Sequence, residues 1–153
     1  FKCDWSSDVC SSDLASLQSG APFTVNIPSD NANVGAGPAQ RPDLVRNPIL
    51  ESGQTPERWF DTNAFALSAP FTFGNLGRNT LFTDGLQTVD FSVLKSLSIT
   101  ESAAAEFRFE IFNLLNHPNF SNAPGRIAFT PSFGRYFQAE NPRQLQLGLK
   151  ISF

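Results

Sequence analysis

The last ten residues of this 153-residue chain, 144–153, alternate between apolar side chains and polar or small ones without a break. In an extended strand, Leu145, Leu147, Leu149, Ile151 and Phe153 lie on one face, because successive side chains of a strand point to opposite sides. The other face carries polar or small residues: Gln144, Gln146, Gly148, Lys150 and Ser152. Residues 143–153 are therefore predicted to form an amphipathic β-strand.

Three earlier segments have the same period of two. Residues 89–99 and 103–112 each place apolar side chains on one face, with Lys95 as the single polar break. Residues 15–27 end in the alternating sequence FTVNI. The pattern predicts an all-β chain with four strands.

The predicted strands are about 9–11 residues long, the length that a tilted strand needs to cross a bilayer. Strands of soluble proteins are mostly about 5–6 residues long. The polar face of 103–112 carries the charges of Glu106, Arg108 and Glu110, which suggests an apolar face toward lipid and a polar face toward a lumen. A soluble β-sandwich would show the same alternation with its faces reversed, so strand length, not alternation, favours the membrane.

The connections between the predicted strands are of two kinds. Residues 100–102 form a short link, whereas residues 28–88 and 113–142 are about sixty and about thirty residues long and rich in Pro, Gly and Asn. Unstructured loops of this length are rare inside a compact domain, but outer-membrane barrels combine short periplasmic turns with longer extracellular loops. If the final strand runs toward the periplasm, both long connections are extracellular and the short one is periplasmic.

The composition excludes two classes of protein. A formal net charge of −3 gives no basic surface for nucleic acid, and no apolar run approaches the ~18–20 residues of a transmembrane helix. Apolar residues make up 41% and charged residues 16%, and the 11 Pro and 10 Gly disfavour long helices. An all-β protein with long loops remains, either soluble or in an outer membrane.

The first fourteen residues are unlike the rest of the chain. They show no apolar period and no signal-peptide layout, and residues 4–14, DWSSDVCSSDL, resemble the in-frame translation of a common sequencing-library adapter. We therefore expect 1–14 to be an artefact without structure, in which Cys3 and Cys10 form neither a disulfide nor a metal site. Residues 15–153 are then the natural part, and its own N-terminal portion is expected to be missing.

The last strand also contains a specific local pattern. Gln146, Gly148, Ile151 and Phe153 fit polar-x-Gly-x-x-apolar-x-aromatic. This pattern resembles the signal by which the barrel-assembly machinery recognises outer-membrane barrels. It offers a strand edge for augmentation and a terminal Phe suited to the interfacial aromatic girdle. The alternative is an amphipathic edge strand that ends in Phe.

Several short motifs, in their order and spacing, resemble the C-terminal part of TonB-dependent receptors, specifically the Oar-like group with a carboxypeptidase-regulatory-like N-terminal domain. The similarity covers nearly all of 15–153. The motifs are RPD at 41–43, WFD at 59–61 with AF at 64–65, FGNLGRN at 73–79, VDFS at 89–92 with Lys95, FRFEIFNLLNHPNF at 107–120 and NPRQ at 141–144.

The resemblance implies an outer-membrane β-barrel of about 22 strands in a Gram-negative bacterium, with a plug, that imports bulky ligands using energy from the TonB complex. This chain would supply the C-terminal antiparallel strands and long extracellular loops. Its expected partners are outer-membrane lipid, the barrel-assembly machinery, a bulky ligand and the TonB complex, the last through an N-terminal part absent here. Three or four strands cannot close a barrel, so the chain alone is not expected to transport.

No residue pattern indicates catalysis, a cofactor or a metal, and we expect no enzyme activity. His117, the single histidine, has no companions at metal-ligand spacing and is predicted to shape a turn. Residues 74–79 lack the glycine-lysine-hydroxyl sequence of a phosphate loop, and their Gly and Asn are expected to allow positive φ. Glu106 and Glu110 would lie about 13 Å apart on a strand, beyond the roughly 5–9.5 Å of glycosidase pairs.

Aromatic residues cluster in the first long loop. Trp59, Phe60 and Phe65 are candidate ligand contacts, since extracellular aromatic side chains can stack on sugars, although packing of the loop onto itself is the favoured interpretation. Phe71 and Phe73 belong to the same cluster. Two alternatives to a receptor remain: a soluble secreted carbohydrate-binding β-sandwich, and a non-transporting outer-membrane adhesion or structural barrel.

Overall fold

The computed structural model describes residues 2–4, 9–35 and 40–153. The chain forms two compact units. The sheet unit comprises residues 1–18, 86–119 and 140–153, and the loop unit comprises residues 19–85 and 120–139. In the described residues no helix is long and apolar enough to span a membrane.

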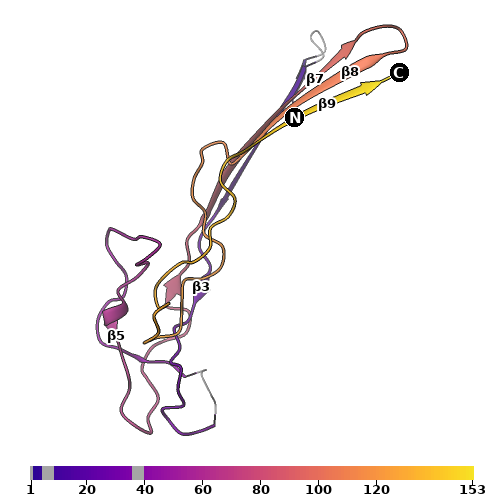
Figure 1. Ribbon diagram of the computed structural model, residues 1–153. Helices are drawn as coiled ribbons and strands as arrows, with labels where there is room; N and C mark the ends of the chain where they lie inside the picture. Colours follow the sequence, from indigo (N-terminus) through magenta and orange to yellow (C-terminus); the bar gives the residue numbers. More distant parts are fainter. Residues whose placement is uncertain (1, 5–8, 36–39) are drawn as a thin grey trace. The chain divides into compact units, whose positions relative to one another are not determined.

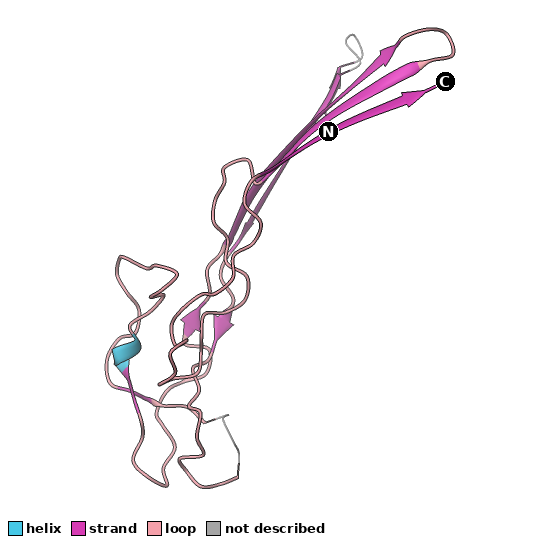
Figure 2. Ribbon diagram, viewed as in Figure 1, coloured by secondary structure: helices cyan, strands magenta, loops and turns pink. Residues whose placement is uncertain are grey.

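The sheet unit is one antiparallel sheet with the strand order β1-β2-β7-β8-β9. Figure 1 labels three of its long strands, and Figure 2 shows them as extended arrows. The strands are β1 (Lys2–Asp4), β2 (Val9–Gln18), β7 (Leu86–Ser98), β8 (Ala104–Phe112) and β9 (Gln144–Ser152). The predicted all-β, antiparallel fold is confirmed.

The last three strands agree with the sequence patterns at 89–99, 103–112 and 143–153 to within three residues at each end. The link between β7 and β8 is a tight turn, in which Ile99 N and Thr100 N donate to the carbonyl of Ala103 at 2.8 and 3.0 Å. The alternating pattern predicted these strands well because each has one apolar face and one polar face along its length.

The strand predicted over 15–27 is wrong as a single element. Residues 15–18 complete β2, and the chain then enters the loop unit, where β3 (Pro22–Phe23) pairs with β6 (Leu81–Phe82). A side chain at Gly20 would collide with the backbone of Thr83, so the chain turns where only glycine fits. The apolar residues after this turn do share one face, but that face lies in the core of the loop unit.

The expectation that 1–14 has no structure is wrong for residues 2–4 and 9–14; residues 1 and 5–8 lie outside the described part. β2 pairs with β7 continuously from Val9 to Gln18, because ladder hydrogen bonds use the backbone and not the side chain. Cys10 lies opposite Cys3 in the β1–β2 register and is disulfide-bonded, contrary to the expectation. The resemblance of residues 4–14 to an adapter concerns the gene and stays a prediction.

The long connections fold into a unit with its own core and are not unstructured loops. Besides β3 and β6, the loop unit contains the paired strands β4 (Asp43–Leu44) and β5 (Phe65–Ala66) and the 3-10 helix η2 (Thr62–Ala64). Both connections contribute to the core: Phe23, Val25, Ile27, Phe60, Ala64, Phe65, Leu76, Leu81, Ala128 and Phe133.

The tetrapeptide Ala-Pro-Phe-Thr occurs twice in the loop unit, at 21–24 and at 69–72. Phe23 is a buried residue of β3. Phe71 is 75% exposed and has a φ of 62°, in a turn closed by Thr72 N donating to Ala69 O at 3.1 Å. Position three of such a turn normally takes glycine, so the second copy holds an aromatic side chain outward on a strained backbone.

Candidate functional site

The two faces of the sheet differ in chemistry. Cross-strand neighbours share a face, and on one face the pairs are Val93–Phe109 and Phe109–Leu147, with further apolar pairs on either side. Leu145, Leu147 and Leu149 are 66–69% exposed. No described element of the sheet unit covers this broad apolar surface, which soluble monomers rarely expose.

The opposite face is polar. Ser92, Glu110 and Gln146 form one row across β7, β8 and β9, and Ser96, Glu106 and Lys150 form another. The predicted placement of the charged side chains of β8 on one face is confirmed. Arg108 lies between the two rows, 3.5 Å from Glu106, and this half-exposed ion pair adds little stability.

Charged residues of β7 and β2 interrupt the apolar face. Lys95 of β7 lies opposite Phe107 near the turn end of the sheet, where a long side chain can carry its charge toward water. Asp13 of β2 lies opposite Phe91, and Ser11 lies opposite Val93, whereas Ala15 faces Val89. On this face of β2, the residues after position 14 are apolar, whereas Ser11 and Asp13, within the adapter-like sequence 4–14, are polar.

The four residues of the assembly-signal pattern lie on or just beyond β9. Gln146 and Gly148 are on the polar face, and Ile151 is on the apolar face opposite Ala105. Phe153 follows the last strand residue and is fully exposed. Within the described residues β9 pairs with β8 alone, so its outer edge is available for another strand.

Asparagine side chains complete the sheet at the end from which the long connections leave. The Asn119 side chain accepts from Gln87 N at 2.8 Å and donates to Gln87 O at 3.1 Å, as a neighbouring strand residue would. Glu140 N donates to Asn119 O at 2.7 Å, so residues 120–139 leave and return at one point.

His117 belongs to the turn that precedes Asn119. Its backbone N–H donates to Asn113 Oδ1 at 3.0 Å, and Asn113 Nδ2 donates to the His117 carbonyl at 2.9 Å. Asn113 has a φ of 52°, which asparagine tolerates. The turn itself is closed by Asn116 N donating to Asn113 O at 2.8 Å, His117 follows it, and the turn role predicted for His117 stays a prediction. The described residues contain no group of three metal-ligating side chains.

The turn prediction for 74–79 is confirmed in part. Asn79 has a φ of 55°. Gly74 has ordinary backbone angles, but a side chain there would collide with the carbonyl groups of Arg41 and Pro42. Gly74 therefore serves close packing of two segments, a role that sequence alone does not distinguish from a turn.

The aromatic cluster of the first connection is divided by the structure. Phe60 and Phe65 are 1% and 5% exposed, and their rings pack on each other and on Phe133 with centroid distances of 5.1–5.8 Å. Packing of the loop onto itself therefore accounts for both. Phe71 and Phe73 are exposed.

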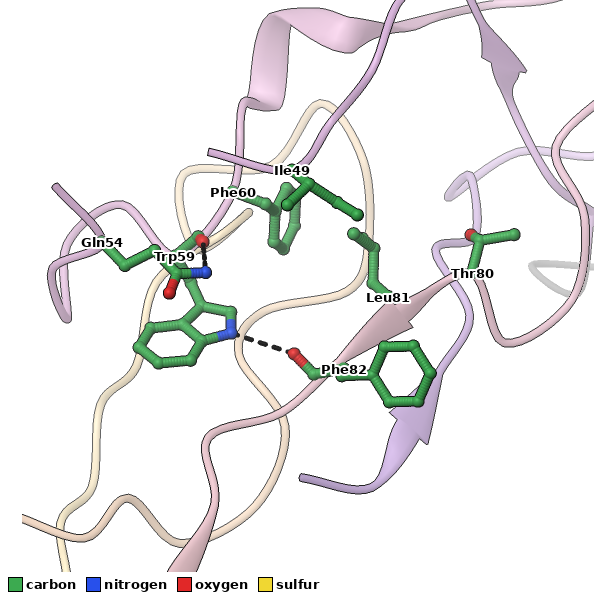
Figure 3. Close-up of a pocket in the computed structure, with 7 residues that line it drawn as sticks. All are labelled: Ile49, Gln54, Trp59, Phe60, Thr80, Leu81 and Phe82. Carbon is green, nitrogen blue, oxygen red and sulfur yellow. Dashed lines mark hydrogen bonds between the residues drawn. The ribbon is translucent and has the colours of Figure 1, made fainter. Parts of the chain in front are cut away.

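Trp59 lines a cavity of about 100 Å³ in the loop unit (Figure 3). Its indole N–H donates to Phe82 O at 3.0 Å, and the Gln54 amide donates to Trp59 O at 3.1 Å. The ring makes edge-on contacts with Tyr136 at 5.1 Å and Phe120 at 6.3 Å. The lining residues are Ile49, Gln54, Trp59, Phe60, Thr80, Leu81 and Phe82. Sequence reasoning found two of them and missed the others, because they come from three separate segments without a shared motif.

The Tyr136 ring packs edge-on against Trp59, and its hydroxyl accepts a hydrogen bond from Asp84 N at 2.8 Å. Burial raises the pKa of the Tyr136 phenol above its usual value, so this hydroxyl stays neutral at physiological pH. The Trp59 ring is thereby held in one orientation.

Asp61, directly after Trp59 and Phe60, ties three segments of the loop unit together. Its carboxylate lies 2.7 Å from Arg46 and 3.3 Å from Arg58 and accepts from Asn63 N at the start of η2. Burial alone would raise the pKa of Asp61, but the Asn63 hydrogen bond and the two guanidinium groups outweigh it and hold the pKa below its usual value. No pattern in the sequence predicts this arrangement, because Arg46 is fifteen residues away.

Long amphipathic strands with one exposed apolar face, one charged face and extended connections on a single end define a segment of a transmembrane β-barrel. The family model described as an outer membrane beta barrel domain matches residues 11–146. The chain belongs to this family, which places it in the outer membrane. No curated protein and no solved structure matches the chain. Family membership overturns the alternative of a soluble secreted β-sandwich.

Proposed function

We propose that this chain is the C-terminal part of a TonB-dependent receptor that takes up or recognises a ligand at the surface of a Gram-negative cell. The motifs between RPD at 41–43 and NPRQ at 141–144 support this family, and membership of the outer-membrane barrel family agrees with it. Five strands cannot close a barrel, since the smallest has about eight. The unpaired outer edge of β9 requires a further strand, because open edges are not tolerated in lipid.

The observation that carries the proposal is the asymmetry of the two ends of the sheet. Because the strands are antiparallel, the C-terminal ends of β2 and β8 lie at the same end of the sheet as the N-terminal ends of β7 and β9. Both long connections leave from that end, and the other end carries the tight turn at 99–103. Short periplasmic turns and long outer loops are the arrangement of outer-membrane barrels, so the loop unit would face the medium.

The edge strand β9 would carry the assembly signal through Gln146, Gly148, Ile151 and Phe153. A side chain at Gly148 would fit within the sheet, since the nearest atom to its Cβ position is Arg108 Cβ at 3.6 Å. Packing on β8 therefore does not require glycine, which agrees with a role of Gly148 in recognition by the assembly machinery. We expect removal of Phe153 to block folding into the outer membrane in cells, and Phe137→Ala, in an exposed position of the loop unit, to leave it unchanged. Normal assembly without Phe153 would contradict the signal.

Two measurements on cells that express the complete gene test the receptor. Protease added to intact cells should cut within residues 19–85, and the turn at 99–103 should be cut only after the outer membrane is opened. Depletion of TonB should then abolish ligand accumulation. Surface cleavage together with ligand accumulation that does not depend on TonB would instead indicate a non-transporting adhesion or structural barrel. Protection of residues 19–85 from protease in intact cells would overturn the proposed orientation.

A further inference from the structure

The cavity beside Trp59 is formed by rigid walls. Phe60 and Leu81 are buried core residues, and Ile49 and Phe82 are more than half exposed where the cavity opens. Figure 3 shows Trp59 facing Phe60, with Leu81 and Ile49 beside them. Because the Trp59 indole is fixed by its bond to Phe82 O and by Tyr136, the cavity keeps its shape without a ligand, which favours binding.

The size of the cavity limits what can enter it. A cavity of about 150 Å³ accommodates benzene with its six heavy atoms, so a volume of about 100 Å³ admits about four heavy atoms. A pyranose ring is too large.

The chemistry of the lining residues further limits which groups can bind in the cavity. Five of the seven lining side chains are apolar and none is charged, so a charged group would lose its hydration without a partner. The Gln54 amide nitrogen is used by Trp59 O, and its oxygen is left to accept from a ligand. The Thr80 hydroxyl, on the other side of the cavity in Figure 3, has no hydrogen-bond partner within the described part of the chain. Polar groups therefore flank an apolar centre.

We propose that this cavity binds the branched aliphatic side chain of a short uncharged peptide, with an adjoining backbone N–H donating to the oxygen of Gln54. An isobutyl group has four carbon atoms and matches the volume, and it leaves no polar atom against Phe60 or Leu81. The proposal deepens the proposed function by naming a ligand class. Uptake of the peptide would rest on the proposed receptor function, but its binding to the cavity would not. Binding itself is measured on the purified chain without a membrane potential or TonB.

Trp59 provides the signal for the test, and Trp5→Phe removes the second tryptophan. In the full chain with this change, N-acetyl-leucinamide should alter Trp59 fluorescence in a saturable manner. N-acetylglycinamide, which keeps the amide groups but lacks the isobutyl group, should bind at least about tenfold more weakly. The charged N-acetyl-aspartamide should not bind. Equal binding of the leucine and glycine compounds, or no saturation by the leucine compound within its solubility, would overturn the proposal.

Two variants locate the site. Ile49→Ala removes part of the wall and should weaken N-acetyl-leucinamide binding about tenfold, whereas Leu67→Ala, which is similarly exposed but outside the cavity, should not change it. An equal effect of both variants would place binding elsewhere. If Ile49→Ala fails to fold by circular dichroism, the compound series decides alone. Failure of peptide binding with intact TonB-dependent uptake would remove this proposal and leave the receptor function standing.

Discussion

The sheet unit and the loop unit use apolar side chains in opposite ways. Leu147 of β9 is 69% exposed, whereas Phe60 of the loop unit is 1% exposed. The sheet unit has regular backbone pairing and an uncovered apolar face, and the loop unit has little regular pairing and a closed core. The sheet unit therefore depends on lipid and neighbouring strands to cover its surface, and the loop unit is stabilised by its own packing.

The largest effect should come from the core of the loop unit. Phe60→Ala removes a ring that packs on Phe23, Phe65 and Phe133 and should lower the free energy of unfolding by about 3–5 kcal/mol. Phe73→Ala, at an exposed position, should change it by less than about 0.5 kcal/mol. Denaturant unfolding of the loop unit, followed by Trp59 fluorescence, measures both, and similar losses would show that the core assignment is wrong.

The next effect separates the two faces of the sheet. Leu147→Lys places a charge in the middle of β9 on the apolar face, and it should destabilise the membrane-inserted barrel by about 2–4 kcal/mol. Gln146→Lys, one residue away on the polar face, should be nearly neutral. Urea titration of the complete protein in lipid vesicles distinguishes them. If Gln146→Lys is the more harmful change, the faces have been assigned to the wrong sides.

The loop unit should also depend on pH through Asp61. Its pKa is lowered in the folded state, so its contribution is present above the unfolded pKa of about 3.9 and is lost as the pH falls through the lower folded pKa. Asp61→Asn should cost about 1–3 kcal/mol at neutral pH and flatten the acid limb of the stability profile. Denaturant midpoints measured from neutral to strongly acidic pH test this. An unchanged acid limb in Asp61→Asn would assign the pH dependence to other groups.

A smaller effect concerns Asp13, which interrupts the apolar alternation of β2. Asp13 lies on the apolar face opposite Phe91, and Asp13→Leu should stabilise the membrane-inserted protein by about 1–2 kcal/mol, less than the effect for a basic residue. Leu14→Asp, on the opposite face, serves as the comparison. It leaves the lipid-facing side unchanged and should not stabilise the protein. A long sequencing read through the codons for 1–14 tests the adapter prediction directly. If that prediction is correct, the natural codons should encode apolar residues at positions 9, 11 and 13.

The smallest effect is also stabilising and concerns the loop unit. Phe71→Gly relieves a positive φ, which costs a residue with a Cβ about 1–2 kcal/mol, and it loses little buried surface because Phe71 is 75% exposed. After the entropy cost of glycine, the loop unit should gain about 0.5–1 kcal/mol. Phe73→Gly, where φ is not positive, should instead lose about 0.5–1 kcal/mol. Calorimetry of the two variants compares them, and destabilisation by Phe71→Gly would mean that the phenyl ring makes a stabilising contact.

Sequence reasoning succeeded where structure is periodic and failed where it depends on distant contacts. The faces of β7, β8 and β9 follow from the alternation alone, whereas their register is known only from the structure. The two Ala-Pro-Phe-Thr segments show the limit of local pattern, since one is buried strand and the other is an exposed turn. Asn31 decides between them, because its side chain donates to Ser68 O and Ala69 O and holds the second copy in its turn.

The cavity beside Trp59 could not be predicted for the same reason. Gln54, Trp59 and Phe82 are brought together by hydrogen bonds between separate segments, and no spacing in the sequence encodes them. Asp61 was similarly missed, although it stands within a motif that supported the family resemblance. The role of this carboxylate depends on Arg46 and Arg58, which only the folded structure places beside it.

The hydrogen bonds of Asn119 separate the stability of the sheet from that of the loop unit. The Asn119 amide satisfies both backbone groups of Gln87, and Glu140 N bonds to Asn119 O, so the backbone of β7 at this edge has its partners without residues 120–139. Substitutions within residues 120–139 should therefore act on the core of the loop unit, to which Ala128 and Phe133 contribute, and should leave the pairing of β7 unchanged.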